Sequence, residues 1–108
     1  MLGLLGLGFR GRRIEIGAEP VLRAAREERA KLLLLASDAG ESIARQLDAA
    51  AGKTPVLRCG YDKATLGSAF GRGTCSVAAV CDSRLASELS ARLVSDNSME
   101  VALFGKHH

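Results

Sequence analysis

The residue types that most often carry out catalysis are scarce in this sequence. The two histidines, His107 and His108, close the chain and match the remnant of an affinity tag, so none is left for a catalytic triad or a zinc hydrolase site. Asp38, Asp62 and Asp82 each precede a helical pattern, where helix capping explains them. We therefore expect a protein that is not an enzyme and that has no small-molecule substrate, metal ion or cofactor.

A dinucleotide-binding fingerprint, G-x-G-x-x-G, occurs from Gly6 to Gly11. The fingerprint binds a pyrophosphate only when a strand precedes it and a helix follows it. Here only five residues precede Gly6, and a strand-like segment, residues 13–16, follows Gly11. We interpret the glycines as sites of close packing in a first helix and at its exit.

The three cysteines, Cys59, Cys75 and Cys81, form an odd set without a C-x-x-C pair. Such a set predicts neither a disulfide framework nor a zinc site. We interpret them as buried structural thiols, which favours a reducing compartment, the cytoplasm.

The formal net charge of +3 is unevenly distributed. Residues 1–31 hold seven basic and four acidic residues, whereas the rest of the chain has eight of each sign. Clustered arginine favours an anionic partner such as RNA, and a solvated helix face is the alternative interpretation. The four aromatic residues are too scattered to form a base-stacking platform, so an RNA contact would use another surface.

The elements that must position these residues follow from periodicity. Residues 32–36 form a continuous apolar run, typical of a central strand covered on both faces. Further strand patterns cover residues 13–16, 55–59 and 75–81, and helical patterns cover the residues before Gly11, about 20–28, 38–52, 62–71 and the residues from Asp82 onward. This alternation predicts an α/β fold, a three-layer α/β/α sandwich with a central four-stranded mixed sheet.

The chain length of 108 residues fits one domain, and no apolar stretch is long enough to span a membrane. We assign residues 1–95 to this domain and residues 96–108 to a C-terminal tail that includes the histidines. Residues 99–104 form either a late edge strand or a loose tail. The apolar residues 1–9 belong to the fold, because their arginines follow the apolar stretch whereas a signal peptide carries charge before it.

Several segments together resemble a known protein family. They are Leu4–Leu7, Gly17–Arg23, the strand Ala30–Asp38 (A-K-L-L-L-L-A-S-D), Pro55–Val56 and the turn Leu66–Gly71 (L-G-S-A-F-G). In this order they resemble the L-seven-Ae family of ribosomal proteins, within it the small bacterial YlxQ-type members, over residues 2–94. The resemblance implies an α/β/α sandwich that binds kinked RNA duplexes called kink-turns.

The resemblance also implies which residues contact RNA. In the family, the motif G-x-N-E-x-x-K opens the second helix and reads the guanines of sheared G·A pairs. On this chain Gly17 matches the glycine, Glu19 stands where the family has Asn, Pro20 where it has Glu, and Arg23 where it has Lys. Two of the four positions depart from the motif, and Pro20 cannot replace a carboxylate acceptor.

A second implied contact is the loop after the L-G-S-A-F-G turn, which contains Arg72, Gly73 and Thr74. Arg10, Arg12, Arg13 and Lys31 are expected to add phosphate contacts. The predicted partner is structured RNA, ribosomal RNA among the options, bound by a monomer. A protein-interaction module on the same scaffold, without affinity for RNA, is the alternative function.

Overall fold

A leucine strand buried on both faces sets the layers of the fold. The computed structural model describes residues 2–95 and 99–101. Its strand β2 (Leu32–Leu35) is at most 1% exposed along its whole length. Leu32 and Leu34 face one core cluster, and Leu33 and Leu35 face another. A strand that is apolar on both sides therefore has helices on both sides, as predicted.

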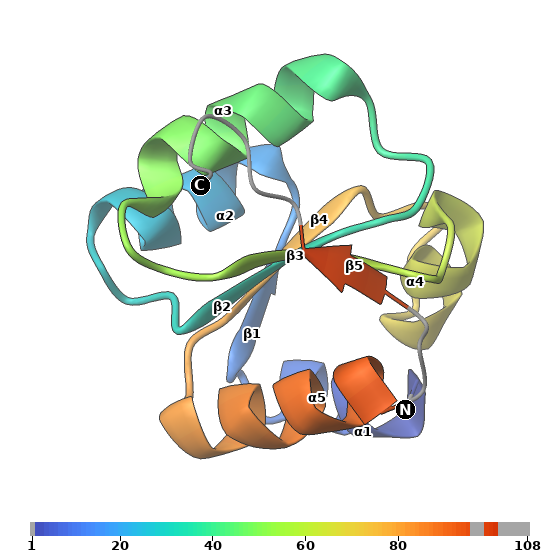
Figure 1. Cartoon of the computed structure of the whole chain (residues 1–108). Coiled ribbons are helices and arrows are strands. Elements are labelled where there is room, and N and C mark those ends of the chain that lie inside the picture. The colour runs from blue at the N-terminus through green and yellow to red at the C-terminus, as the bar shows by residue number, and fades with distance from the viewer. Residues whose placement is uncertain (1, 96–98, 102–108) are drawn as a thin grey trace.

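The helices form the two outer layers (Figure 1). One core cluster contains residues of α2 (Ala18–Arg26) and α3 (Glu41–Ala51), which cover one face of the sheet. The other contains residues of α1 (Leu2–Arg10), α4 (Lys63–Ala69) and α5 (Ser83–Ser95), which cover the opposite face. The predicted three-layer α/β/α sandwich is confirmed.

The sheet has the strand order β1-β4-β2-β3-β5. Its remaining strands are β1 (Ile14–Ile16), β3 (Val56–Cys59), β4 (Val77–Val80) and β5 (Met99–Val101). β2 pairs parallel with β3, whereas β4 runs antiparallel to both β1 and β2. The four predicted strands thus form the predicted mixed sheet.

A fifth strand extends that sheet beyond the predicted four. β5 pairs antiparallel with β3, with Arg58 opposite Glu100. The sequence allowed either an edge strand or a tail for residues 99–104. A strand of three residues is too short to show a hydrophobic period, so the pattern did not decide between the two. Residues 102–104 lie outside the described part of the chain.

The fingerprint glycines serve packing, as expected. A Cβ on Gly6 would lie 2.9 Å from the Ala69 carbonyl oxygen of α4, and one on Gly8 would lie 2.6 Å from Leu85 of α5. Both contacts are closer than a side chain permits, so the glycines let α1 lie directly against the two helices.

The helix caps agree with the sequence at two positions and differ at a third. Asp62 accepts a hydrogen bond from the Thr65 amide at 2.8 Å, and Asp82 accepts one from the Leu85 amide at 3.0 Å. Asp38 does not cap α3, whose N-cap residue is Gly40. Its carboxylate instead accepts a hydrogen bond from the Lys63 amide at 2.8 Å, so it ties the loop after β2 to the first turn of α4.

Among residues 2–95 and 99–101, no helix has the length and apolar character needed to cross a bilayer.

Candidate nucleic-acid interface

Strand direction brings the two predicted RNA-contact segments to one end of the sheet. Since β1, β2 and β3 run parallel and β4 runs against them, three carboxyl ends and the amino end of β4 meet on one side. We call this side the carboxyl end of the sheet, and the opposite side the amino end. The carboxyl end carries a hollow of about 490 Å³, which is lined by Ile16, Gly17, Ala18, Ile43, Arg72 and Thr74–Val77.

The start of α2 forms one wall of this hollow. Gly17, its N-cap residue, has φ +93° and ψ 152°, a conformation that L side chains rarely adopt. Gly17 has no side chain to cap the helix, so no N-cap side chain stands at the positive end of the helix dipole. Glu19 and Arg23 lie one helical turn apart and both are exposed. Neither takes part in an ion pair within residues 2–95 and 99–101.

The loop between α4 and β4 forms the opposite wall and is held by backbone contacts. The Arg72 amide donates to the Gly67 carbonyl at 2.7 Å, and the Cys75 amide donates to the Lys63 carbonyl at 3.0 Å. A Cβ on Gly67 would lie 2.6 Å from Thr74 Cα, so α4 and the loop backbone are in direct contact. The loop therefore has a fixed position relative to α4.

An aromatic pair beneath this loop orients its arginine. The guanidinium carbon of Arg72 lies 5.8 Å from the centre of the Phe9 ring. That ring packs at 5.4 Å against Phe70, at an interplanar angle of 60°. At this distance a cation–π attraction favours one placement of the Arg72 side chain.

The structure brings some of the predicted contact residues together and separates others. Gly17, Arg72 and Thr74 line the same hollow, Gly73 lies between the last two, and Glu19, Pro20 and Arg23 are on the adjoining helix α2. Arg13 and Lys31 precede β1 and β2 and therefore lie at the amino end. A strand of four residues spans about 13 Å, so these two residues do not belong to the hollow, and their role as phosphate contacts stays a prediction.

Sequence reasoning missed several residues of this region, among them Ile43 and Phe9. Ile43 on α3 lines the hollow but follows the same apolar spacing as the core residues of its helix. Phe9 occupies a variable position of the glycine fingerprint, which says nothing about its role, and its contact with Arg72 joins segments 63 positions apart. Neither role leaves a signal in a single sequence.

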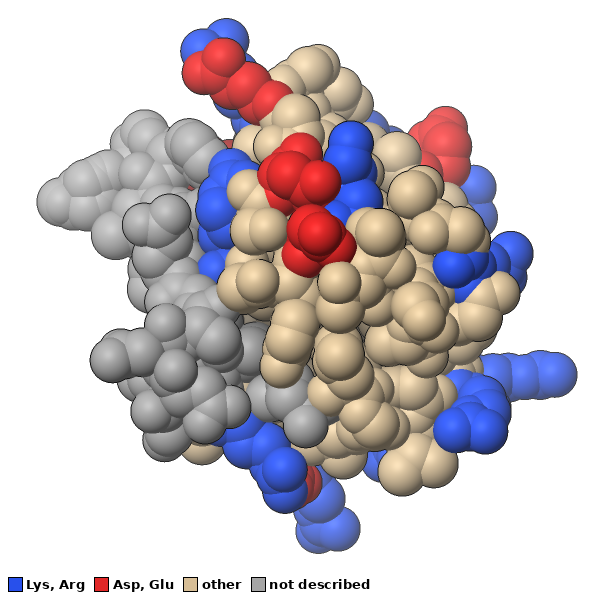
Figure 2. All heavy atoms as spheres, turned by 90° about the vertical axis from the view of Figure 1, so that its right-hand side faces the viewer, with Lys and Arg blue, Asp and Glu red and all other residues tan. Residues whose placement is uncertain are grey.

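The carboxyl end carries both signs of charge. Figure 2, which looks onto the side of α4 and the start of α3, shows acidic side chains in the upper middle and basic ones along the right-hand margin. Asp38 and Asp62 accept backbone hydrogen bonds here. The Thr65 amide lowers the pKa of the Asp62 carboxyl, because it stabilises the ionised form.

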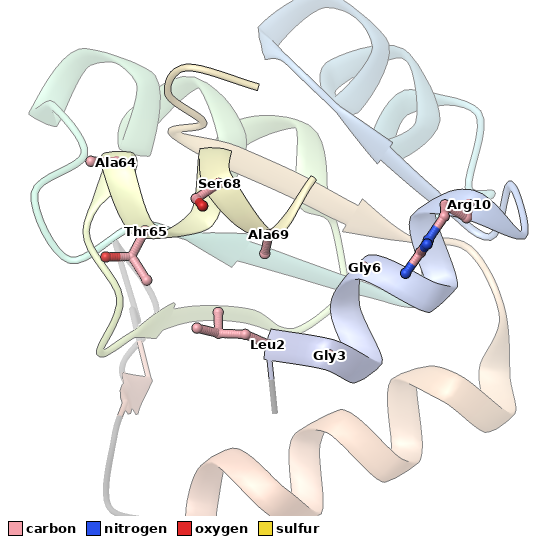
Figure 3. A pocket seen from close by; sticks show the side chains of 8 residues that line it. All are labelled: Leu2, Gly3, Gly6, Arg10, Ala64, Thr65, Ser68 and Ala69. Carbon is pink, nitrogen blue, oxygen red and sulfur yellow. The ribbon is translucent and has the colours of Figure 1, made fainter. Parts of the chain in front are cut away.

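A second hollow, of about 530 Å³, lies between α1 and α4 (Figure 3). Small residues line most of it, and Leu2 and Arg10 of α1 complete it. Apart from Arg10 it has no charged group.

The described residues contain no group of three histidine, cysteine or carboxylate side chains that could hold a metal ion. Cys59 and Cys75 are buried, at 2% and 5% exposure, as predicted, and Cys81 is partly buried. Burial raises the pKa of all three thiols, which keeps them protonated and poorly reactive.

Comparison with known proteins identifies the family of the chain. The family model of the ribosomal protein L7Ae/L30e/S12e/Gadd45 family matches residues 4–90, most of the chain. The chain belongs to this family. The resemblance seen in the sequence is thereby confirmed.

Individual proteins are similar to the chain in sequence and in fold. The RNA-binding protein YlxQ of Bacillus subtilis (strain 168) is 34% identical over 94 residues, which cover 83% of this chain and 91% of YlxQ. A solved structure from Bacillus halodurans C, described as a protein with unknown function, superposes with a TM-score of 0.80 at 32% identity and covers 86% of this chain and 95% of its own.

The fold recurs in a more distant protein. The Giardia lamblia 15.5kD RNA binding protein has a TM-score of 0.67 at 21% identity, covering 87% of this chain and 84% of its own.

Proposed function

We propose that this L7Ae family protein binds structured RNA without catalysing a reaction, and that a kink-turn-like bend is its preferred target. Family membership and the similarity to an RNA-binding protein, YlxQ, support RNA as the partner. The observation that carries the proposal is the single hollow in which Gly17 and the Arg72–Thr74 loop meet. The RNA is ribosomal or another structured RNA of the bacterial cytoplasm, and residues 1–95 form the monomeric binding domain.

Each wall of the hollow has its own task in this proposal. Gly17 lets the RNA backbone approach the start of α2, since no side chain stands there. Arg23 presents paired N–H donors that match O6 and N7 of guanine. Arg72 meets phosphate, and Gly73 and Thr74 permit close approach.

The two departures from the family motif shift the reading of bases toward Arg23. Glu19 and Pro20 lie in the first turn of α2, where the family has Asn and Glu. Pro20 offers neither a backbone N–H nor a side-chain acceptor. We therefore expect Arg23 to carry most of the discrimination between base pairs.

The experiment that tests the proposal is a titration of the full chain with a fluorescent kink-turn RNA and with a control RNA that lacks the G·A pairs, at two salt concentrations. We expect tighter binding to the intact kink-turn. Equal and strongly salt-dependent binding would indicate a general RNA binder, and no binding would favour the protein-interaction module instead.

Arg23→Ala should cost about 1–3 kcal/mol on the intact kink-turn and less on the control RNA, because a base contact is lost only in the first. Arg92→Ala serves as the matched control, since Arg92 is an exposed arginine on α5, paired with Glu88 at 3.0 Å. Equal losses on both RNAs would show that Arg23 contacts phosphate rather than a base.

A further inference from the structure

Most of the basic residues in the first third of the chain lie away from the hollow at the carboxyl end. At the amino end of the sheet, the carboxyl ends of α2 and α3 and the residues that lead into β2 and β3 surround another hollow, of about 630 Å³. Arg26, Lys31 and Lys53 line it, together with one carboxylate, that of Glu28. We call this the amino-end hollow.

The three cations of the amino-end hollow are available to a partner. All three are exposed, and none forms an ion pair within the described ranges 2–95 and 99–101. Other arginines at this end are engaged: Arg29 bonds Glu27 at 2.8 Å and Glu15 at 3.2 Å, and Arg13 lies 3.7 Å from Asp82. The net charge of the lining residues is therefore positive.

A simpler explanation would be that these cations neutralise the carboxyl ends of the helices. Three of the last four carbonyl groups of α2, those of Arg23, Ala24 and Ala25, already accept backbone hydrogen bonds from residues 27–30. No side-chain cation is needed to cap this helix, so its Arg26 and the neighbouring Lys31 are not explained by capping.

We propose that the amino-end hollow binds the phosphate backbone of an RNA duplex, as a second contact separate from the hollow at the carboxyl end. The inference extends the proposed RNA binding but does not depend on the kink-turn preference. Lysine suits a phosphate contact, because its ammonium group acts as a point charge on a flexible stem. Such a contact does not read the base sequence.

The chemistry of the hollow favours RNA over a protein partner. A protein interface commonly has an aromatic or aliphatic side chain that fills a pocket at its centre. The one large apolar side chain that is exposed among the described residues is Leu7, on α1, in the layer on the other face of the sheet. A protein partner would therefore find charge here but no anchor.

The test uses the full chain and an uninterrupted RNA duplex of about 16 base pairs, a length that known duplex-binding domains span. The variant carries Lys31→Gln and Lys53→Gln. The matched control carries Arg45→Gln and Arg92→Gln, which removes the same charge from the outer faces of α3 and α5, where the side chains are 71% and 51% exposed. Thermal unfolding confirms that both variants fold.

The loss of two phosphate contacts should reduce the slope of log K against log salt concentration by about 1.8. Lowering the salt from about 200 to about 50 mM should then strengthen wild-type binding about 12-fold more than binding of the lysine variant. The arginine control should behave as wild type. Equal behaviour of the two variants, or a lysine variant that matches wild type, would overturn the proposal.

A short kink-turn RNA separates this inference from the proposed function. The lysine variant should bind it as wild type does, because the short RNA occupies only the carboxyl end. If wild type does not prefer the kink-turn while the duplex result holds, the kink-turn target is wrong and the second surface stands. Polyglutamate serves as a mimic of an acidic protein. If the lysine variant loses binding to polyglutamate but binds the RNA duplex as wild type does, the partner is an acidic protein and the inference is overturned.

Discussion

At the scale of single residues, the site depends on placement more than on residue type. Arg72 is one of many arginines, but its guanidinium lies over Phe9, which in turn packs on Phe70. Phe9 touches no RNA in the proposed arrangement and acts by positioning Arg72. Sequence reasoning named Arg72 from the family loop, whereas the role of Phe9 appears only when α1 and the loop are seen side by side.

Phe9→Leu should weaken kink-turn binding about 2- to 5-fold, the equivalent of the 0.5–1 kcal/mol of an exposed cation–π contact. The same substitution in an Arg72→Gln background should have no effect, because the cation is already gone. A titration of the four proteins measures this coupling. An equal loss in both backgrounds would mean that Phe9 only fills space.

Asp62 supplies a pH dependence at the residue scale. Because the Thr65 amide lowers its pKa in the folded state, its contribution to stability is complete above the ordinary aspartate pKa of about 3.9 and is lost as the pH falls through the lower, folded value. Asp62→Asn should therefore show a smaller loss of stability than wild type between pH 5 and 2. Urea unfolding at several pH values measures it, and parallel curves for the two proteins would contradict it.

At the scale of elements, the sequence predicted the strands and helix caps that follow from local periodicity. It missed the features that depend on contacts between elements far apart in the chain. The buried run of β2 and the caps of α4 and α5 follow from local patterns. Asp38 has the spacing of a capping box with Glu41, but its carboxylate binds the Lys63 amide because the loop after β2 turns toward α4. Arg13 and Lys31 were expected to add phosphate contacts, and strand direction places them at the amino end of the sheet, away from Gly17.

The contact of α4 with the protein loop between α4 and β4 gives a prediction at this scale. Gly67→Ala would put a Cβ 2.6–2.8 Å from the backbone of Gly73 and Thr74, so the loop must move. We expect a loss of about 1–3 kcal/mol in stability and weaker RNA binding. Gly40→Ala is the control, because nothing lies within 4 Å of its Cβ and its φ is −66°. Denaturant unfolding and RNA titration report the two effects, and a variant that matches this control would contradict the prediction.

At the scale of the whole molecule, the last strand completes the sheet without contributing to the site. The lining residues of the carboxyl-end hollow fall between Ile16 and Val77, and the buried core residues that the structure describes end at Leu89. Within the described ranges 2–95 and 99–101, β5 pairs with β3 alone, at the far edge from β1. The proposed domain of residues 1–95 therefore retains the site and both core clusters.

A chain ending at residue 95 should fold and bind the kink-turn RNA with the affinity of the full chain. It should also unfold at a lower temperature and associate more readily. Losing β5 leaves the backbone groups on the outer edge of β3 without partners, whereas those facing β2 stay paired, and an exposed edge strand pairs with other chains. Thermal unfolding and light scattering measure both changes. A shortened chain that does not fold would instead make β5 part of the domain and move its boundary beyond residue 101.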